Sequence, residues 1–178
     1  MDENEKIKEI AFELESEHVK VSGEQRFVYS GQSMWPILKE GDCLLTMNRK
    51  PLRFFLGDLV VYRSSDDFVV HRFLCYGNRG EKRVIVAKPD NSFYKDVPIR
   101  EDFCVGKVIK VIRSDVGLDF RQGFLIRSLN YMIGLMSFAE LVLVEGMQRF
   151  RLPIFSALSL PRRFAVKIGN YYVTERIR

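Results

Sequence analysis

Apolar residues near the start of the chain follow the period of an amphipathic helix. Between residues 4 and 19 they recur every three or four positions, with acidic residues between them. The positions that share this spacing are Ile7, Ile10, Ala11, Leu14 and His18. We therefore predict that residues 1–24 contain a helix whose apolar side docks on the main domain.

Short runs of β-branched and aromatic residues follow from residue 25, and turn residues separate them, which is typical of strands in an antiparallel sheet. Polar stretches at residues 64–67 and 77–80 are expected to close hairpins. The pattern predicts a compact β domain over residues 25–114, with strands at Arg26–Tyr29, Cys43–Met47, Asp58–Arg63, Phe68–Tyr76, Arg83–Ala87 and Val105–Ile112.

The helical period returns after Gly123. Residues 124–144 are strongly apolar and are interrupted by Arg127, Asn130 and Glu140. Their length is compatible with a membrane span of about 20 residues, but Asn130 and several small residues favour a helix that docks on the protein or lies at a membrane interface. The predicted fold is mainly β (α+β), with an N-terminal helix and a C-terminal helical, basic extension over residues 115–178.

The amino-acid composition indicates that the protein has a substantial hydrophobic core. With 47% hydrophobic and 12% aromatic residues, the 178-residue chain can bury a sizeable apolar interior, so it is not a disordered protein. Its three cysteines, Cys43, Cys75 and Cys104, form no CxxC pair and are interpreted as small buried hydrophobes. We expect no metal and no cofactor, and the odd number of cysteines favours a reducing compartment.

Charge is distributed unevenly along the chain, although the net charge of +5 is modest. The first 24 residues carry eight acidic residues against three lysines, and the chain from residue 120 carries nine basic residues against three acidic ones. Such a tail favours peripheral contact with an anionic membrane, and the alternative is a solvated face of a helical appendage. Binding to nucleic acid is not expected. Because the sequence begins with the acidic MDENEKIKEI rather than a secretory signal, we expect the protein in the cytoplasm, peripheral to the membrane.

The first segment with candidate chemistry is GQSMWPIL at residues 31–38, directly after the predicted strand Arg26–Tyr29. A serine held on a sharp turn at the end of a strand can present its hydroxyl and its backbone N–H to a substrate carbonyl. Those are the requirements of a nucleophile and of half an oxyanion hole. Ser33 is therefore the candidate nucleophile, although a serine at this position could also simply cap a turn.

The second segment is FVVHRFL at residues 68–74, where strand alternation places His71 on an apolar face with Val69 and Phe73. An imidazole among apolar neighbours stays neutral and can accept the proton of a serine. The alternative is a histidine that is simply hydrogen-bonded within the core. The chain has one other histidine, His18, which is interpreted as a surface or packing residue.

The third segment, KPDNSFYKD at residues 88–96, supplies two carboxylates. Either Asp90 or Asp96 could accept the other ring N–H of His71 and fix its tautomer, as the third member of a catalytic triad does. Each aspartate alone is also compatible with an Asx turn or with a solvated side chain.

Together the segments resemble the motifs of signal peptidase I, in the same order. The stretch GQSMWPIL (31–38) is similar to its serine box, GDLVVYRSSDDFVVHRF (57–73) to its GDxVVF and VVHR motifs, VIVAKPDNSFYKD (84–96) to its TKGDNN segment, and VGKVIKVI (105–112) to its closing GKV strand. The resemblance covers roughly half of the chain. It implies the coiled β-sheet peptidase core of that family.

Carried over by motif, the resemblance makes Ser33 the nucleophile, His71 the base and Asp96 the orienting acid, with Asp90 in a supporting position. A histidine base places the chain nearer the endoplasmic-reticulum and archaeal type than the common bacterial type, which uses lysine. The chain departs from the family pattern at Pro89, where a glycine is usual.

Two further departures lie within the serine box. Ile37 stands in place of the usual threonine, and Gly31 stands where many relatives carry a hydroxyl in the oxyanion hole. We also expect no N-terminal membrane anchor of the kind that signal peptidases have, so the substrate need not be a secretory precursor.

The expected function is that of a serine endopeptidase that cleaves a protein or a leader- or signal-like peptide. Self-cleavage, as in LexA-like repressors, is disfavoured because the short N-terminal segment shows no helix-turn-helix. The non-enzymatic alternative is a catalytically inactive, signal-peptidase-like module that binds a membrane or a protein partner through its basic tail.

Overall fold

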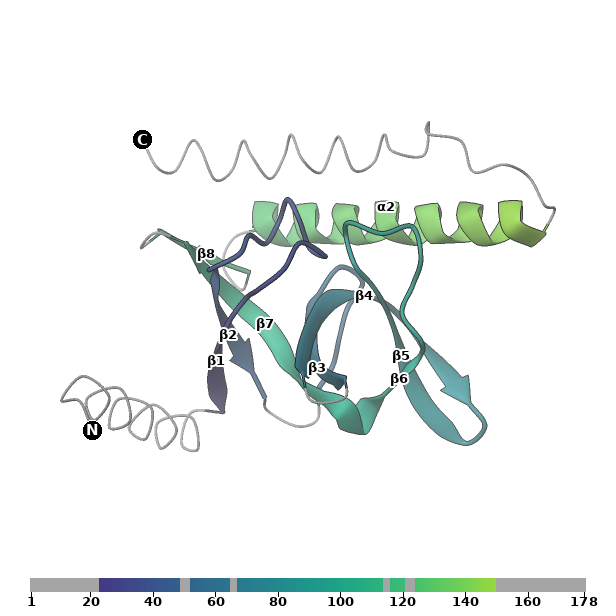
Figure 1. The fold of residues 1–178 in the computed structure, drawn as a ribbon, viewed down its shortest axis with the longest axis horizontal. Helices are drawn as coiled ribbons and strands as arrows, with labels where there is room; N and C mark the ends of the chain where they lie inside the picture. Colours follow the sequence, from purple (N-terminus) through teal and green to yellow (C-terminus); the bar gives the residue numbers. More distant parts are fainter. Residues whose placement is uncertain (1–22, 49–51, 65–66, 114–115, 121–123, 150–178) are drawn as a thin grey trace.

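The computed structural model describes residues 23–48, 52–64, 67–113, 116–120 and 124–149. In these ranges the chain forms an eight-stranded antiparallel sheet and one long helix (Figure 1). The elements are β1 (Glu24–Val28), β2 (Cys43–Met47), β3 (Leu59–Ser64), β4 (Asp67–Arg79), β5 (Lys82–Lys88), β6 (Ile99–Arg100), the 3₁₀ turn η1 (Glu101–Phe103), β7 (Cys104–Arg113), β8 (Val116–Asp119) and α2 (Phe124–Arg149).

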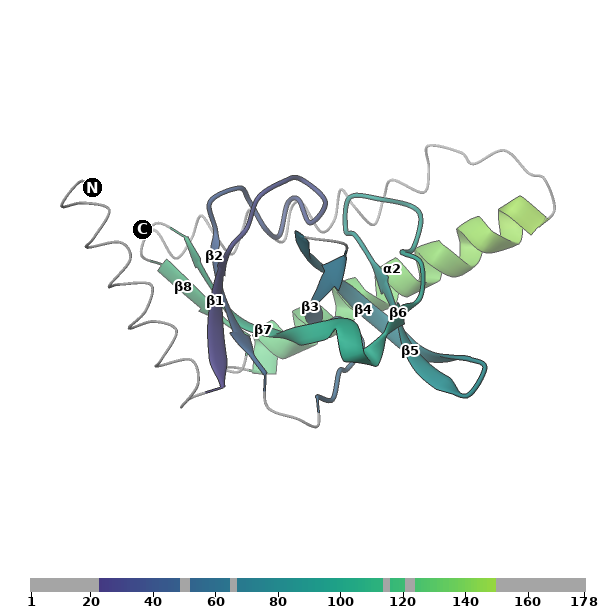
Figure 2. The ribbon, with the colours of Figure 1, turned by 60° about the horizontal axis from the view of Figure 1, so that its bottom comes forward.

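The strands are ordered β1-β2-β7-β3-β4-β5-β6, with β8 paired to β7 beside this path. The long strand β7 is the centre of the arrangement, because its first half pairs with β3 and its second half with β8, while β2 pairs along its other side. The register shifts at Leu45/Thr46 and again at Val61/Tyr62. Such bulges increase the local twist of a sheet, and Figure 2 shows β7 running from the side of β1, β2 and β8 to the side of β3, β4, β5 and β6.

The predicted mainly β architecture with a C-terminal helix is confirmed. All six predicted strands are present, and β2 has the predicted bounds. The strand alternation and turn residues that predicted them also place β3 and β4 in a hairpin, with Ser64 opposite Asp67. The helix predicted over residues 124–144 is present as α2 and continues to Arg149.

Two details of the prediction are wrong. Residues 77–79 continue β4, and the chain reverses at Gly80 and Glu81, between the paired residues Arg79 and Lys82. Gly80 has φ +63°, the left-handed conformation that a two-residue hairpin turn requires. The β domain was predicted to end at residue 114, whereas β8 extends the sheet to Asp119. The helix predicted within residues 1–24 and the tail after residue 149 lie outside the described residues.

The core has two parts, which lie on opposite faces of β3. Successive side chains of a strand point to opposite faces, so Leu59 and Val61 enter one cluster, and Val60 and Tyr62 enter the other. The first cluster also holds Tyr29, Met34, Leu38, Leu44, Val70, Val108 and Val111. The second also holds Phe54, Phe73, Ile85, Ala87, Ile99 and Cys104.

Helix α2 lies along one side of the sheet (Figure 1) and approaches the protein backbone closely at one point. A Cβ atom placed on Gly134 would lie 2.6 Å from the Cα atom of Gly57, and one placed on Gly57 would lie 2.2 Å from the carbonyl oxygen of Asn130. Gly57 has φ +95°. Two glycines therefore allow the helix to rest directly on the turn that precedes β3.

Candidate active site

The loop between β1 and β2 holds Ser33 by anchoring the residues on either side of it. Met34 and Leu38 are fully buried, whereas Ser33 is half-buried. The hydroxyl of Tyr29 accepts a hydrogen bond from the backbone N–H of Met34 at 3.0 Å and lies 3.1 Å from Ser33 Oγ. Gly31, with φ +109°, provides the left-handed conformation at the start of the turn. The loop thus presents the serine beside a tyrosine hydroxyl at the edge of the core.

Asp42 fixes the far end of this loop. Its carboxylate accepts a hydrogen bond from the backbone N–H of Lys39 at 2.8 Å and forms a two-bond ion pair with Arg113 of β7, at 2.6 and 2.7 Å. The same guanidinium donates to the carbonyl oxygen of Ile37 at 3.1 Å. Asp42, which follows the serine segment in the sequence, therefore anchors the Ser33 loop to the central strand.

His71 lies on β4 and contacts Asp96. Its Nδ1 atom is 2.6 Å from Asp96 Oδ2, and Tyr62 of β3 donates to the same oxygen at 2.9 Å. Tyr62 Oη is also 3.1 Å from the ring nitrogen. Because a carboxylate only accepts hydrogen bonds, this network assigns the proton of the neutral ring to Nδ1. The lone pair of Nε2 is then available to act as a base.

The position of Tyr62 follows from the β3–β4 register. Val60 is paired with His71, so Tyr62, two residues along β3, lies on the same face of the sheet as the imidazole. Burial, and after it the negative charge of Asp96, raises the pKa of the Tyr62 phenol well above its ordinary value. Tyr62 therefore stays protonated at neutral pH and remains a hydrogen-bond donor to Asp96.

The two candidate aspartates lie on the same loop, between β5 and β6, but have different partners. Asp96 reaches His71, and its backbone N–H bonds to the carbonyl oxygen of Ala87 at 2.9 Å. Asp90 instead forms a two-bond ion pair with Arg72, with both distances 2.7 Å. The Arg72 side chain is fully buried and that of Asp90 is 6% exposed. The structure thus brings Asp96, and not Asp90, to the imidazole.

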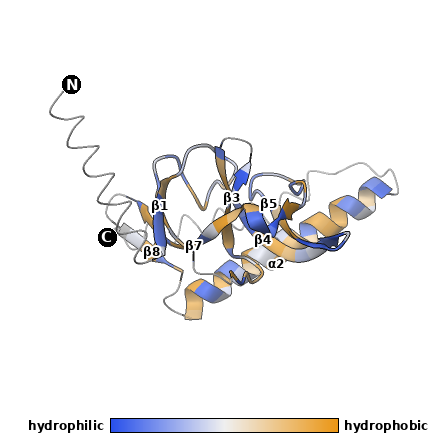
Figure 3. Cartoon of the chain, turned by 90° about the horizontal axis from the view of Figure 1, so that it is seen from below, coloured by the Kyte–Doolittle hydropathy of each residue, from blue (hydrophilic) through white to orange (hydrophobic). Residues whose placement is uncertain are grey.

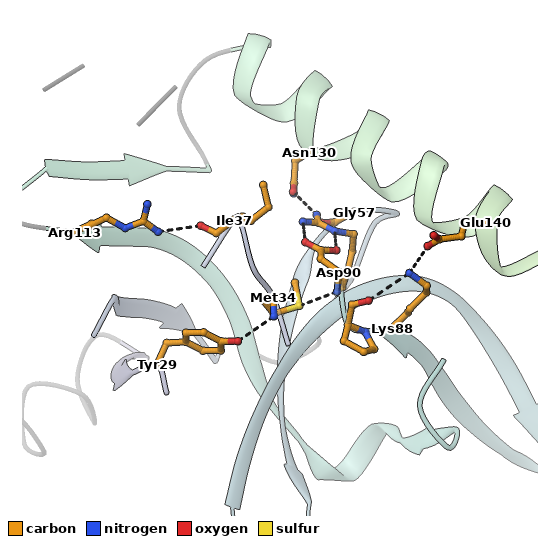
Figure 4. A network of polar contacts seen from close by, with 11 residues as sticks. Tyr29, Met34, Ile37, Gly57, Lys88, Asp90, Arg113, Asn130 and Glu140 are labelled. Carbon is orange, nitrogen blue, oxygen red and sulfur yellow. Dashed lines mark hydrogen bonds and ion pairs between the residues drawn. The ribbon is translucent and has the colours of Figure 1, made fainter. Parts of the chain in front are cut away.

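Arg72 also connects the site to helix α2. Its guanidinium donates to the carbonyl oxygen of Gly57 and to Oδ1 of Asn130, both at 2.6 Å. Figure 4 shows Asn130 pointing from α2 toward this cluster. Asp90 therefore belongs to a buried polar cluster with Arg72, Gly57 and Asn130. This cluster joins the loop of Asp96 to helix α2.

A second buried connection lies one residue before Pro89. Lys88 Nζ is 2.7 Å from Glu140 Oε2 of α2, with side chains 1% and 3% exposed. The same ammonium group is 3.3 Å from the carbonyl oxygen of Pro89 (Figure 4). The helix thus holds both Lys88 and, through Arg72, Asp90, at the start of the loop that carries Asp96.

The loop of Ser33 and the loop of Asp96 contact each other through Asn91. Its backbone N–H donates to the carbonyl oxygen of Ser33 at 2.8 Å, and its side-chain amide donates to the carbonyl oxygen of Gln32 at 3.3 Å. The loop that carries Ser33 therefore packs against the loop that carries Asp96, whose carboxylate contacts His71. Among the described residues, however, Ser33 Oγ is hydrogen-bonded to Tyr29 and not to His71.

Four residues of the candidate site were not predicted from the sequence: Tyr29, Tyr62, Arg72 and Glu140. Tyr62 could have been predicted from the sequence. The hairpin at residues 64–67 sets the strand register, and this register places Tyr62 on the same face of the sheet as His71. Glu140 had no local signal, since its partner Lys88 lies far away in the sequence.

Other features of the described residues add little chemistry. A cavity of about 420 Å³ lies beside the first turns of α2, lined among others by Asp58, Lys107, Phe120 and Asn130, and it does not include Ser33, His71 or Asp96. No group of three or more metal-ligating side chains occurs in the described part of the chain.

The three cysteines are free thiols. Cys104 is buried, in agreement with its interpretation as a core residue, whereas Cys43 and Cys75 are half-buried.

Comparison of the chain with models of protein families, with curated proteins and with solved structures gave no significant match.

Proposed function

We propose that the protein is a serine endopeptidase in which Ser33 is the nucleophile, His71 the general base and Asp96 the residue that orients His71. The observation that carries this proposal is the partly buried Asp96–His71 contact of 2.6 Å, which leaves Nε2 as the basic nitrogen. The contact between Asn91 and the carbonyl of Ser33 supports it, because it ties the acid and serine loops together. The motif resemblance to signal peptidase I supports the same assignment.

The reaction follows from the roles of these atoms. Nε2 of His71 takes the proton of Ser33 Oγ as the oxygen attacks the substrate carbonyl, and the imidazolium then returns the proton to the leaving amine. For this step Ser33 Oγ must leave its hydrogen bond to Tyr29 and turn to Nε2. Asp96 holds the Nδ1–H tautomer and stabilises the imidazolium.

The backbone N–H of Ser33 suits the role of an oxyanion donor. Among the described residues it donates to no acceptor, and it belongs to the residue whose oxygen would attack. This arrangement also accounts for Gly31, since a backbone donor needs no hydroxyl at that position. The substrate class suggested by the resemblance is a protein or a leader- or signal-like peptide bound as an extended strand.

The test is cleavage of a complex peptide library, with the products identified by mass spectrometry. We expect the full-length protein to generate a defined set of cleavages and Ser33→Ala to abolish them with little change in melting temperature. Ser64→Ala, which removes an exposed hydroxyl at the end of β3, is the matched control and should cleave normally. Cleavage by Ser33→Ala at the wild-type rate would rule out Ser33 as the nucleophile.

A second candidate function has one observation in its favour. Ser33 Oγ is hydrogen-bonded to Tyr29 and not to His71, as it would be in a module that has kept the fold and binds partners without cleaving them. Such a module would associate with a membrane or a protein through its basic tail. Peptides that bind the wild-type protein and are recovered intact would favour this function over catalysis.

A further inference from the structure

The outward side of α2 is apolar along most of the helix. The buried residues of α2 are Ile133, Gly134, Ser137, Glu140, Leu141 and Val144. Every exposed residue between positions 128 and 144 is apolar or aromatic: Tyr131, Met132, Leu135, Phe138, Ala139, Val142 and Leu143. At 1.5 Å per residue, this stretch is about 25 Å long. Figure 3 shows hydrophobic residues over much of the length of α2.

The charges of α2 are arranged so that none interrupts this outward stretch. Glu140 is the one charged residue between positions 128 and 144, and it points inward to Lys88. Glu145 follows the stretch and is paired with Lys95 at 2.5 Å. A helix that faces water normally carries charged and polar residues on its outer side. The outward side of α2 is therefore suited to an apolar environment.

The docking of α2 determines how the helix can meet a membrane. Within the described residues it is the helix that is long and apolar enough to span a bilayer. It contacts the β domain near its start, through Asn130 and Arg72, and near its end, through Glu145 and Lys95. If the docked helix crossed the bilayer, the sheet beside it would enter the hydrocarbon, where exposed polar groups and strand edges are not tolerated. Docked α2 is thus compatible with a membrane only when it lies parallel to the surface.

We propose that α2 lies in the plane of an anionic lipid bilayer, with its outward side at the boundary between headgroups and acyl chains and the β domain on the aqueous side. Charge complementarity supports lipid as the occupant. Arg149 is exposed at the end of the helix, and residues 150–178 carry six basic residues against one acidic residue. Such charges are attracted to anionic headgroups beside a buried apolar face.

A lipid surface also fits the side chains better than a protein surface does. Specific protein interfaces carry about one hydrogen bond per 100–200 Å². The exposed side chains between positions 128 and 144 offer one polar group, the hydroxyl of Tyr131. A bilayer needs no matching polar partners. This inference does not depend on peptidase activity.

The experiment measures binding of full-length Ser33→Ala protein to vesicles by co-sedimentation, so that no proteolysis intervenes. We expect binding to vesicles that contain phosphatidylglycerol and weaker binding to vesicles of phosphatidylcholine alone. Leu135→Glu should reduce binding roughly tenfold or more, because it removes one buried apolar side chain and introduces a charge. The matched control Val28→Glu changes a 76%-exposed apolar residue of β1 and should bind normally.

Depth measurements distinguish an in-plane helix from a spanning one. The sequence contains one tryptophan, Trp35, so Trp35→Phe provides a background in which Leu125→Trp, Leu135→Trp and Leu143→Trp each introduce a single reporter. We expect lipids brominated near the headgroup to quench all three reporters to a similar extent. If these lipids instead quench the reporters at 125 and 143 but not the one at 135, position 135 lies deep in the bilayer. That result would show a span and overturn the proposal.

Two further outcomes would also overturn it. A concentration-dependent dimer without vesicle binding, which Leu135→Glu converts to monomer, would show that a second copy covers α2. A monomer that co-sediments with neither kind of vesicle would show that another part of the chain covers the outward side of α2. Loss of peptide cleavage would bear only on the proposed peptidase function, because the binding assay uses the Ser33→Ala protein.

Discussion

At the scale of single residues, the two aspartates of one loop differ in what their carboxylates hold. Asp96 holds the imidazole of His71, and Asp90 neutralises the buried guanidinium of Arg72. The sequence motif places both aspartates near a base, but the spatial arrangement gives them separate tasks. Substitution should separate catalysis from stability.

We predict that Asp96→Asn lowers kcat/KM on the order of 10³-fold or more with little loss of stability, because an amide favours the wrong imidazole tautomer. Asp90→Asn should instead lower the free energy of unfolding by about 3–5 kcal/mol, because it leaves the charge of Arg72 buried and unpaired. Cleavage kinetics and urea unfolding of the two variants test this pair. A stable but inactive Asp90→Asn beside a fully active Asp96→Asn would reverse the assignment.

The pH dependence of cleavage provides a second test at this scale. A general base must be unprotonated, and histidine is the side-chain type whose ordinary titration falls between about pH 5 and 8, so we expect kcat/KM to rise with pH. Because burial and Asp96 raise the pKa of Tyr62, ionisation of this phenol does not contribute to the profile in that range. A pH–rate profile for one peptide measures the rise. A flat profile would exclude a histidine base.

At the scale of elements, α2 rests on the turn before β3 through Gly57 and Gly134. A methyl group at position 134 would lie 2.6 Å from the backbone of Gly57, whereas one at Gly146 would meet nothing within 4 Å. The two glycines of one helix thus form a matched pair for substitution.

We expect Gly134→Ala to destabilise the protein by about 1–3 kcal/mol, because the helix must move off the turn. Gly146→Ala should stabilise it by up to about 1 kcal/mol, because alanine favours helix without any clash. Chemical denaturation of both variants gives the comparison. Equal effects of the two substitutions would show that α2 does not rest on Gly57.

Sequence patterns predicted the elements better than the contacts between them. The six main strands were predictable because each alternates or concentrates apolar residues between turns, whereas β6 has two residues and β8 four, too few to show a period. The sequence indicated Ser33, His71 and the two aspartates as candidates. It could not show that Glu140 meets Lys88, because a charge in an apolar segment looks the same whether it faces lipid, water or a buried lysine.

At the scale of the whole molecule, one buried thiol makes the free energy of unfolding depend on pH in the alkaline range. Burial, followed by the charges of Glu101 and Asp102, raises the pKa of Cys104 from its ordinary value of 9.0 to about 12. Between these values the unfolded chain loses the thiol proton while the folded protein keeps it. The folded state then binds more protons, so the free energy of unfolding falls as the pH rises.

We predict that wild-type stability declines above pH 9 and that Cys104→Ala makes the decline less steep, by at most about 1.4 kcal/mol per pH unit. Urea unfolding at several pH values between about 8.5 and 11 measures the two slopes, and the slopes are compared because the substitution itself also changes packing. Parallel slopes would mean that the thiol titrates alike in the folded and unfolded chains.

The central position of β7 has a consequence for the time at which activity can arise. Strands β2 and β3 do not pair with each other; each pairs with β7. A chain is synthesised from its N-terminus, so Ser33, His71 and Asp96 are all made before Cys104–Arg113. A nascent chain that ends before β7 therefore carries every proposed catalytic group, but it lacks the strand that joins β2 to β3. The proposed peptidase stays inactive until translation has passed residue 113.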